Sequence, residues 1–271
     1  METNVIYNEE CLKGMGKRID DNSIDMILAD LPYGTTACKW DSIIPLEPLW
    51  KQYKRIIKDN GAIVLTASQP FTTKLISSNI EWFRYEWIWE KAVGSNFANL
   101  DYQPMKEHES ILIFSKDTTN YYPIKEKRKG SGIDRAKYKK IHYSHHTNES
   151  QGTKVKETYV KEYDTEQRNP SSIQYFNNRL PKDRGLHPTQ KPVALFEYLI
   201  KTYTNEGEVV LDNVIGSGTT AVACLKTERK FIGFELEEEY YNTALKRIGN
   251  FDKKYYEELP EEERPAQQQL F

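Results

Sequence analysis

The chain has 271 residues with 38 basic and 40 acidic side chains, so its formal net charge is only −2. This length suffices for one large α/β domain or for a core with an inserted module. Three cysteines, Cys11, Cys38 and Cys224, are too few and too scattered for a disulfide framework or a zinc site. The sequence shows no secretory leader and no apolar stretch of membrane-spanning length, so we expect a cytoplasmic protein without a metal centre.

The hydrophobic pattern predicts alternating strands and helices along most of the chain. Strands are expected over residues 24–29, 62–66, 85–89, 111–114, 208–211 and 231–234. Helices are expected over 45–58, 70–78, from 192 onward, over 221–226, and in a last segment that includes Tyr241 and Ile248. Such alternation predicts an α/β fold, a Rossmann-like, mostly parallel sheet with helices on both faces and right-handed crossovers.

A polar and basic insert interrupts this alternation. Residues 117–183 lose apolar periodicity, which is typical of a loose surface segment, but recurring tyrosines favour a partly ordered insert. We therefore divide the chain into a first half of the core (1–116), the insert (117–183), a second half of the core (184–250) and an acidic tail (251–271). The basic residues of the insert are Lys125, Lys127, Arg128, Lys129, Arg135, Lys137, Lys139 and Lys140. They form either a solvated surface or a contact for nucleic-acid phosphates.

The segment Asp30-Leu31-Pro32-Tyr33-Gly34 follows the first buried strand. An acid, a proline, an aromatic ring and a glycine at a strand end are consistent with an ordinary rigid turn. They also bring a carboxylate, a free backbone carbonyl and a flat ring into one small volume. Those three groups together suit the binding of a planar base through its amino group.

A second constellation predicts a nucleotide site. The strand that ends at Asp212 is followed by a glycine-rich loop with Gly216, Gly218 and Thr219, and then by a helix. A helix start presents free amides to an anion, and Glu235, at the end of the next strand, is placed to accept hydrogen bonds from ribose hydroxyls. The loop lacks the Gly-Lys-Ser/Thr of a P-loop. The alternative is a glycine-rich connection without a ligand.

The segment His187-Pro188-Thr189-Gln190-Lys191-Pro192 lies just before a predicted helix. Its two prolines are compatible with a rigid entry into that helix. Alternatively, Lys191 neutralises the carboxylate of a ligand beside the glycine-rich loop.

These motifs, in this order, resemble the amino-group DNA methyltransferases that use S-adenosylmethionine, in the permuted, beta-type subclass whose catalytic tetrad precedes the cofactor loop. By this resemblance, Asp30, Pro32 and Tyr33 match the catalytic tetrad, with Leu31 in place of the commoner proline. The residues that match the cofactor site are Glu10, Asp30, Lys191, Asp212, Gly216, Gly218, Thr219 and Glu235. Asn213-Val214-Ile215 departs from the usual Pro-Phe-x of the loop, and Glu10 stands where the family has Asp.

The resemblance implies a site-specific enzyme of DNA methylation, of the kind found in restriction–modification, that extrudes its target base from double-stranded DNA. Asp30 rather than serine at the start of the tetrad favours adenine N6 over cytosine N4. An RNA or protein methyltransferase and a non-catalytic DNA-binding protein are competing interpretations of the same motifs. The basic insert and the segment 187–192 favour DNA, and the intact motifs favour an enzyme.

The last residues of the chain resemble a short peptide with which bacterial proteins dock on the replication sliding clamp. Gln267, Leu270 and Phe271 would be its anchors, and the alternative is a frayed terminus. The sequence leaves open whether the protein forms a homodimer.

Overall fold

The computed structural model describes residues 1–34, 42–128, 141–146, 155–161, 164, 166–179 and 190–258. The chain forms two compact units, one made of Met1–Tyr122 with Ser172–Phe271 and the other of Pro123–Ser171. The second unit is shorter at both ends than the insert predicted from the sequence, because residues on either side of it pack with the first unit. Among the described residues, none of the helices has the length and apolar character needed to cross a membrane.

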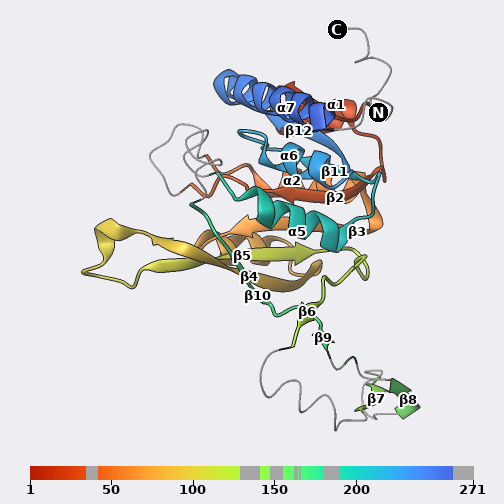
Figure 1. Cartoon of the computed structure of the whole chain (residues 1–271). Helices are drawn as coiled ribbons and strands as arrows, with labels where there is room; N and C mark the ends of the chain where they lie inside the picture. Colours follow the sequence, from red (N-terminus) through yellow and green to blue (C-terminus); the bar gives the residue numbers. More distant parts are fainter. Residues whose placement is uncertain are drawn as a thin grey trace. The chain divides into compact units, whose positions relative to one another are not determined.

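The first unit contains an eight-stranded sheet in the order β1-β12-β11-β2-β3-β5-β4-β10. Five of its seven neighbour pairs are parallel, and the two pairs made by β5 are antiparallel. The prediction of a mostly parallel sheet is therefore confirmed (Figure 1). The strands are β1 (Val5–Asn8), β2 (Ile24–Ala29), β3 (Ile57–Ala67), β4 (Phe83–Ser95), β5 (Lys106–Phe114), β10 (Ile173–Phe176), β11 (Val209–Asp212) and β12 (Lys230–Glu235).

Helices cover both faces of this sheet, as predicted (Figure 1). Side chains of β2 alternate between the two cores, so Met26 and Leu28 pack with α5 and α6, whereas Ile27 and Ala29 pack with α1, α2 and α3. Every residue of β2 is buried, as expected of a central parallel strand. The helices are α1 (Cys11–Arg18), α2 (Leu46–Ile56), α3 (Phe71–Ser78), α5 (Val193–Tyr203), α6 (Thr219–Lys226) and α7 (Glu238–Glu258).

One buried acid ties the centre of the sheet together. Asp25 Oδ1 accepts a hydrogen bond from Lys58 Nζ of β3 at 2.6 Å, and its Oδ2 accepts from the backbone N–H of Val209 at 2.9 Å. A buried carboxylate without such partners would be costly. Asp25 therefore helps to fix where β11 begins relative to β2, although 184 residues separate Asp25 from Val209.

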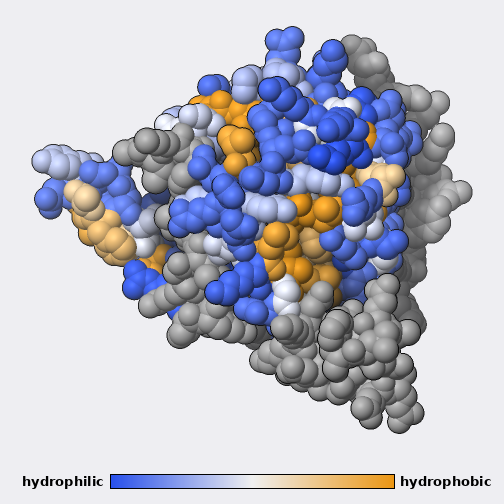
Figure 2. All heavy atoms as spheres, turned by 90° about the horizontal axis from the view of Figure 1, so that it is seen from above, coloured by the Kyte–Doolittle hydropathy of each residue, from blue (hydrophilic) through white to orange (hydrophobic). Residues whose placement is uncertain are grey.

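Strands β4 and β5 form a long hairpin that projects from the rest of the first unit (Figure 1). A short 3₁₀ helix, Phe97–Asn99, lies in its connection. Figure 2 shows hydrophobic side chains on this hairpin, which projects to the left of the view. Phe97 and Leu100 are exposed there, and Tyr102 is 88% exposed.

The second unit contains two small antiparallel pairs. One joins β6 (Glu126–Lys127) to β9 (Gln167–Arg168), and the other joins β7 (Ile141–His146) to β8 (Val155–Lys161). These strands agree with the expectation that the insert is partly ordered.

Two glycines with similar backbone angles allow a test of how α6 packs against α7. Gly218 has a φ of +83°, and a Cβ there would lie 3.1 Å from the Cβ of Ala244, whereas Gly207 has a φ of +80° and no atom within 4 Å of such a Cβ. We expect Gly207→Ala to cost about 1–2 kcal/mol through the backbone alone. Gly218→Ala should cost about 1 kcal/mol more, because the added methyl crowds α7. Urea unfolding measures both, and equal losses would contradict this account of the packing.

Candidate active site

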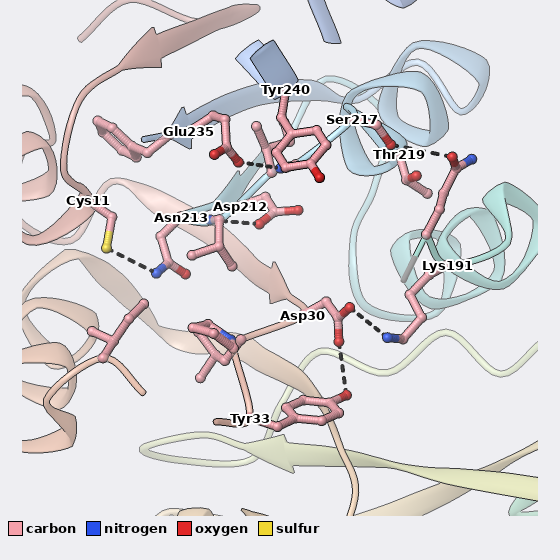
Figure 3. Close-up of a pocket in the computed structure, with 18 of the residues that line it drawn as sticks. Cys11, Asp30, Tyr33, Lys191, Asp212, Asn213, Ser217, Thr219, Glu235 and Tyr240 are labelled. Carbon is pink, nitrogen blue, oxygen red and sulfur yellow. Dashed lines mark hydrogen bonds and ion pairs between the residues drawn. The ribbon is translucent and has the colours of Figure 1, made fainter. Parts of the chain in front are cut away.

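The two predicted constellations meet at one edge of the sheet. Strands β2 and β11 are parallel neighbours, with Leu211 paired to Ile27, so Asp30 and Asp212 leave the sheet at the same edge. Ligands of open α/β sheets bind at the carboxyl ends of strands. A cavity of about 920 Å³ lies there and is lined by residues of both constellations, among them Pro32 and Gly216 (Figure 3).

Three donors hold the carboxylate of Asp30. Its Oδ1 accepts hydrogen bonds from the Tyr33 hydroxyl at 2.9 Å and from the Thr66 hydroxyl, and its Oδ2 accepts from Lys191 Nζ at 2.6 Å (Figure 3). A carboxylate has about four acceptor positions, so one remains free for a further donor. The side chain of Asp30 is 23% exposed, so that position is accessible from the cavity.

Tyr33 lies beside this acid with its ring stacked on Phe71, at a centroid distance of 5.3 Å and an interplanar angle of 25°. Burial raises the pKa of the Tyr33 hydroxyl well above its usual value, and the charge of Asp30 adds to the effect. The phenol therefore stays protonated and donates to Asp30. Together with Pro32, which also lines the cavity, the turn offers the groups that its sequence predicted.

Lys191 does not face the glycine-rich loop. Its ammonium lies 2.6 Å from Asp30 Oδ2 and 3.4 Å from Glu109 Oε2. Burial alone would lower its pKa, but the charges of Asp30 and Glu109 hold that pKa well above the usual value of a lysine. The neighbouring Gln190 lies nearer to the loop, with its Oε1 3.5 Å from the Ser217 hydroxyl (Figure 3).

Asp212 organises the glycine-rich loop rather than opening to solvent. It is 3% exposed, and its carboxylate accepts hydrogen bonds from the backbone N–H of Val214 and from the Thr220 hydroxyl. Burial raises its pKa to about 7, although both hydrogen bonds act in the opposite direction.

Glu235 contacts the same loop. Its Oε2 accepts from the backbone N–H of Gly216 at 2.9 Å and its Oε1 from that of Glu237 at 2.8 Å. Burial raises the pKa of this carboxyl, and the backbone hydrogen bonds oppose the rise. Thr219 lines the cavity and accepts from Arg247, whereas Gly218 caps α6 in a left-handed conformation and packs on α7.

Glu10 is the N-cap of α1. Its two carboxylate oxygens accept from the backbone N–H groups of Leu12 and Lys13, each at 2.9 Å, and the residue also lines the cavity. The capping acid therefore stabilises the helix next to the cavity.

The residues of this edge fit S-adenosylmethionine, because buried acids face a cavity large enough for the cofactor. The buried Nε2 of Gln190, which has no hydrogen-bond partner within the described ranges, offers a donor beside the loop.

No sequence pattern assigned Thr66 or Asn213 a role in the site, and Lys91 and Glu109 lie in segments that resemble those packing near the target base in the family. Thr66 is the last but one residue of β3 and bonds Asp30, while Lys91 and Glu109 come from the β4–β5 hairpin and lie in contact with Lys191 or with each other. Asn213 accepts from Tyr53 at 2.5 Å and donates to Cys11. An acid or a lysine within a strand was the available signal for Glu109 and Lys91.

Only three of the eight basic residues proposed for DNA lie in the described part of the insert. Lys125 is 3.2 Å from Asp164, Arg128 donates to the backbone carbonyl of Asp164, and Lys127 belongs to β6. Among the residues described, no group of three or more His, Cys, Asp or Glu side chains could hold a metal ion. The other five basic residues lie outside the described residues: Lys129, Arg135, Lys137, Lys139 and Lys140. His187 and Thr189 lie outside them as well.

Comparison with known proteins identifies the family. A family model described as DNA methylase, for N6 and N4 amino-methyltransferases, matches residues 24–246. The chain therefore belongs to this family of DNA methyltransferases, and S-adenosylmethionine is its methyl donor.

Two curated relatives and two solved structures show how far the likeness extends. The type II methyltransferase M.HpaI of Haemophilus parainfluenzae is 28% identical over 247 residues, which are 86% of this chain and 70% of the relative. The DNA adenine methyltransferase YhdJ of Escherichia coli K12 is 29% identical over 258 residues, covering 86% of this chain and 78% of that protein. Two solved structures share the fold. The M1.HpyAVI–SAM complex has a TM-score of 0.59 and 23% identity, covering 90% of this chain and 98% of that one, and the cytosine-N4-specific PvuII methyltransferase has a TM-score of 0.64 and 13% identity, covering 94% of this chain and 93% of that one.

The raised pKa of Asp212 predicts a pH dependence of stability. Between its ordinary value of 3.8 and about 7, the folded protein holds a proton that the unfolded chain releases, so this contribution is largest at low pH and is lost as the pH rises to about 7. Asp212→Asn has no such loss. The free energy of unfolding of the variant minus that of the wild type should therefore be higher at pH 8 than at pH 5, by roughly 2 kcal/mol. Urea unfolding at both pH values measures the difference, and parallel pH profiles would contradict it.

Proposed function

We propose that this protein methylates the N6 amino group of adenine at specific sites in double-stranded DNA, with S-adenosylmethionine as donor and with the target base turned out of the helix. The observation that carries the proposal is that the Asp30–Tyr33 turn and the Asp212–Thr219 loop line one cavity. One constellation suits a planar base, and the other suits a nucleoside cofactor.

On this proposal, the cofactor lies along the loop. Glu235 accepts hydrogen bonds from the ribose hydroxyls with the acceptor positions that Gly216 and Glu237 leave free. The backbone of Gly216 and the side chain of Thr219 form the loop surface, while Gly218 and Asp212 keep that surface in shape. The bound cofactor supplies an electrophilic methyl group on a sulfonium.

The cofactor's other proposed contacts are at the two ends of the cavity. Glu10 supports the adenine end from the start of α1. Lys191, proposed from the sequence to neutralise the carboxylate of a ligand, is paired with Asp30, so we propose that it acts at the methyl-transfer end of the cavity. Asp30 itself stands where the methyl group meets the base.

Activation of the base rests on the catalytic turn. An exocyclic amino nitrogen is a poor nucleophile because its lone pair is delocalised into the ring. Asp30 accepts one of its N–H groups at the remaining acceptor position, the backbone carbonyl of Pro32 accepts the other, and the Tyr33 ring contacts the face of the base. The nitrogen lone pair forms the N–C bond, the S–C electron pair returns to sulfur, and one N–H proton leaves toward Asp30 or water. Alignment of this kind is worth up to about 7–11 kcal/mol in favourable cases.

Adenine is favoured by the acid at position 30 and by the likeness to YhdJ, which is named a DNA adenine methyltransferase. The fold itself does not select the base, since the cytosine-N4-specific PvuII enzyme shares it. We propose that the basic residues of the insert contact DNA phosphates, with Lys125, Lys127 and Arg128 as the described members of this set.

Asp30→Ala should abolish methyl transfer, because the amino group then has no carboxylate to bind. Genomic DNA from a host without adenine methylation, incubated with wild-type protein and cofactor, should yield N6-methyladenine on nucleoside mass spectrometry, and the variant should yield less than about 1% of it. Isothermal titration should show cofactor binding by both proteins. N4-methylcytosine in place of N6-methyladenine would correct the base, and product from the variant at the wild-type rate would contradict the role of Asp30.

We also propose that the chain end recruits the enzyme to newly replicated DNA through the sliding clamp. The anchors Gln267, Leu270 and Phe271 lie outside the described residues, and support comes from their sequence pattern. Light scattering can test whether the protein forms a homodimer.

A chain with Leu270→Ala and Phe271→Ala should lose clamp binding in a pull-down, because both apolar anchors are gone, while its methyl transfer to naked DNA stays unchanged. Gln268→Ala, between the anchors, is the matched control and should still bind. Equal capture of all three proteins would end the proposal.

A further inference from the structure

Four buried or half-buried charges of alternating sign lead from the hairpin to the catalytic acid. Lys91 Nζ lies 2.5 Å from Glu109 Oε1, Lys191 Nζ lies 3.4 Å from Glu109 Oε2, and Lys191 Nζ lies 2.6 Å from Asp30. The side chains of Lys91, Glu109 and Lys191 are 6%, 13% and 7% exposed. They come from β4, from β5 and from the residues before α5, so the tertiary fold alone brings them together.

Stability alone does not account for this arrangement. Buried ion pairs lose most of their attraction to desolvation, and apolar residues of similar volume are often as stable or more stable. All four of these charged residues also line the cavity. A role in the chemistry of the cavity is therefore a better reason for keeping them charged.

The contacts of Lys191 are unequal. It bonds Asp30 closely, whereas Glu109 Oε2 is buried and has no hydrogen-bond partner among the described residues, although the ammonium is only 3.4 Å away. Burial alone would raise the pKa of Glu109, but the charges of Lys191 and Lys91 lower it, so this second acceptor is ionised. Lys191 thus has an alternative anion within a short movement of its side chain.

A fixed pair between Lys191 and Asp30 would oppose methyl transfer. During the reaction, positive charge passes from the sulfonium to the amino nitrogen next to Asp30. An ammonium bound only to Asp30 cancels much of the field that stabilises this charge. A second carboxylate that shares the ammonium restores the field, and Lys91 balances the charge of that carboxylate.

We propose that Glu109, anchored by Lys91, is a positioning residue that draws Lys191 away from Asp30 as the target amino group arrives. Lys191 moves onto Glu109 Oε2, and Asp30 then accepts the N–H of the base with its full charge. The inference rests on the proposed methyl transfer and assigns the hairpin a part in it.

The test compares the wild type with four variants in methyl transfer from tritiated cofactor to unmethylated genomic DNA, with cofactor binding measured by titration. Glu109→Gln should lower kcat about tenfold while the Kd for the cofactor stays within about twofold. Glu107→Gln, at an exposed acid two residues earlier on β5, is the matched control and should keep the wild-type kcat. Lys91→Met keeps the second acceptor and should lose less than Glu109→Gln.

The double variant Lys91→Met/Glu109→Gln separates an electrostatic role from a packing role. Glu109→Gln leaves one uncompensated positive charge, and the added Lys91→Met removes it. The kcat of the double variant should therefore be about threefold higher than that of Glu109→Gln. It should stay below the kcat of Lys91→Met, because the second acceptor is missing. Packing damage alone would make the double variant the slowest of all. If Glu109→Gln does not fold, the kcat of the double variant compared with that of Lys91→Met still tests the role of Glu109.

A kcat of Glu109→Gln equal to the wild type, or of the double variant equal to Lys91→Met, overturns the inference and leaves the proposed function standing. A wild-type protein that binds the cofactor but transfers no methyl group to DNA overturns both.

Discussion

The parallel pairing of β2 with β11 is the contact on which the rest of the molecule depends. Strand β2 is buried along its whole length, and Asp25 holds the N–H of Val209 at the start of β11. Parallel strands that start in register also end at the same edge. Asp30, which follows β2, and Asp212, the last residue of β11, therefore share one cavity although they lie in opposite halves of the sequence.

Hydrogen bonds within the protein organise both sides of that cavity. On one side, Asp212 and Glu235 hold the loop through backbone N–H groups of Val214 and Gly216. On the other side, the hydroxyls of Tyr33 and Thr66 hold the carboxylate of Asp30. Groups that are already oriented lose little conformational entropy on binding and need little reorganisation during reaction. The proposed methyl transfer benefits from this property, because alignment supplies much of its rate.

The β4–β5 hairpin links the periphery of the first unit to this centre. Its residues Trp89, Lys91 and Glu109 line the cavity. Glu109 forms ion pairs with both Lys91 and Lys191. The hairpin, whose strands lie between β3 and β10 in the sheet, therefore also contributes to the cavity. Acids and lysines alternate along this path, so Lys91 and Glu109 are connected to Asp30 through Lys191 without touching it.

Local sequence patterns were enough for the main strands, the glycine-rich loop and the turn that begins at Asp30, because buried parallel strands are continuous apolar runs and turns have characteristic residues. They were not enough for β1 and α1, since β1 has four residues and Gly14 and Gly16 weaken the helical signal of α1. They also could not pair Lys191 with Asp30 and Glu109. Such contacts arise only when crossovers bring distant segments to the same edge of the sheet, and no periodicity within a short segment records which partners they will meet there.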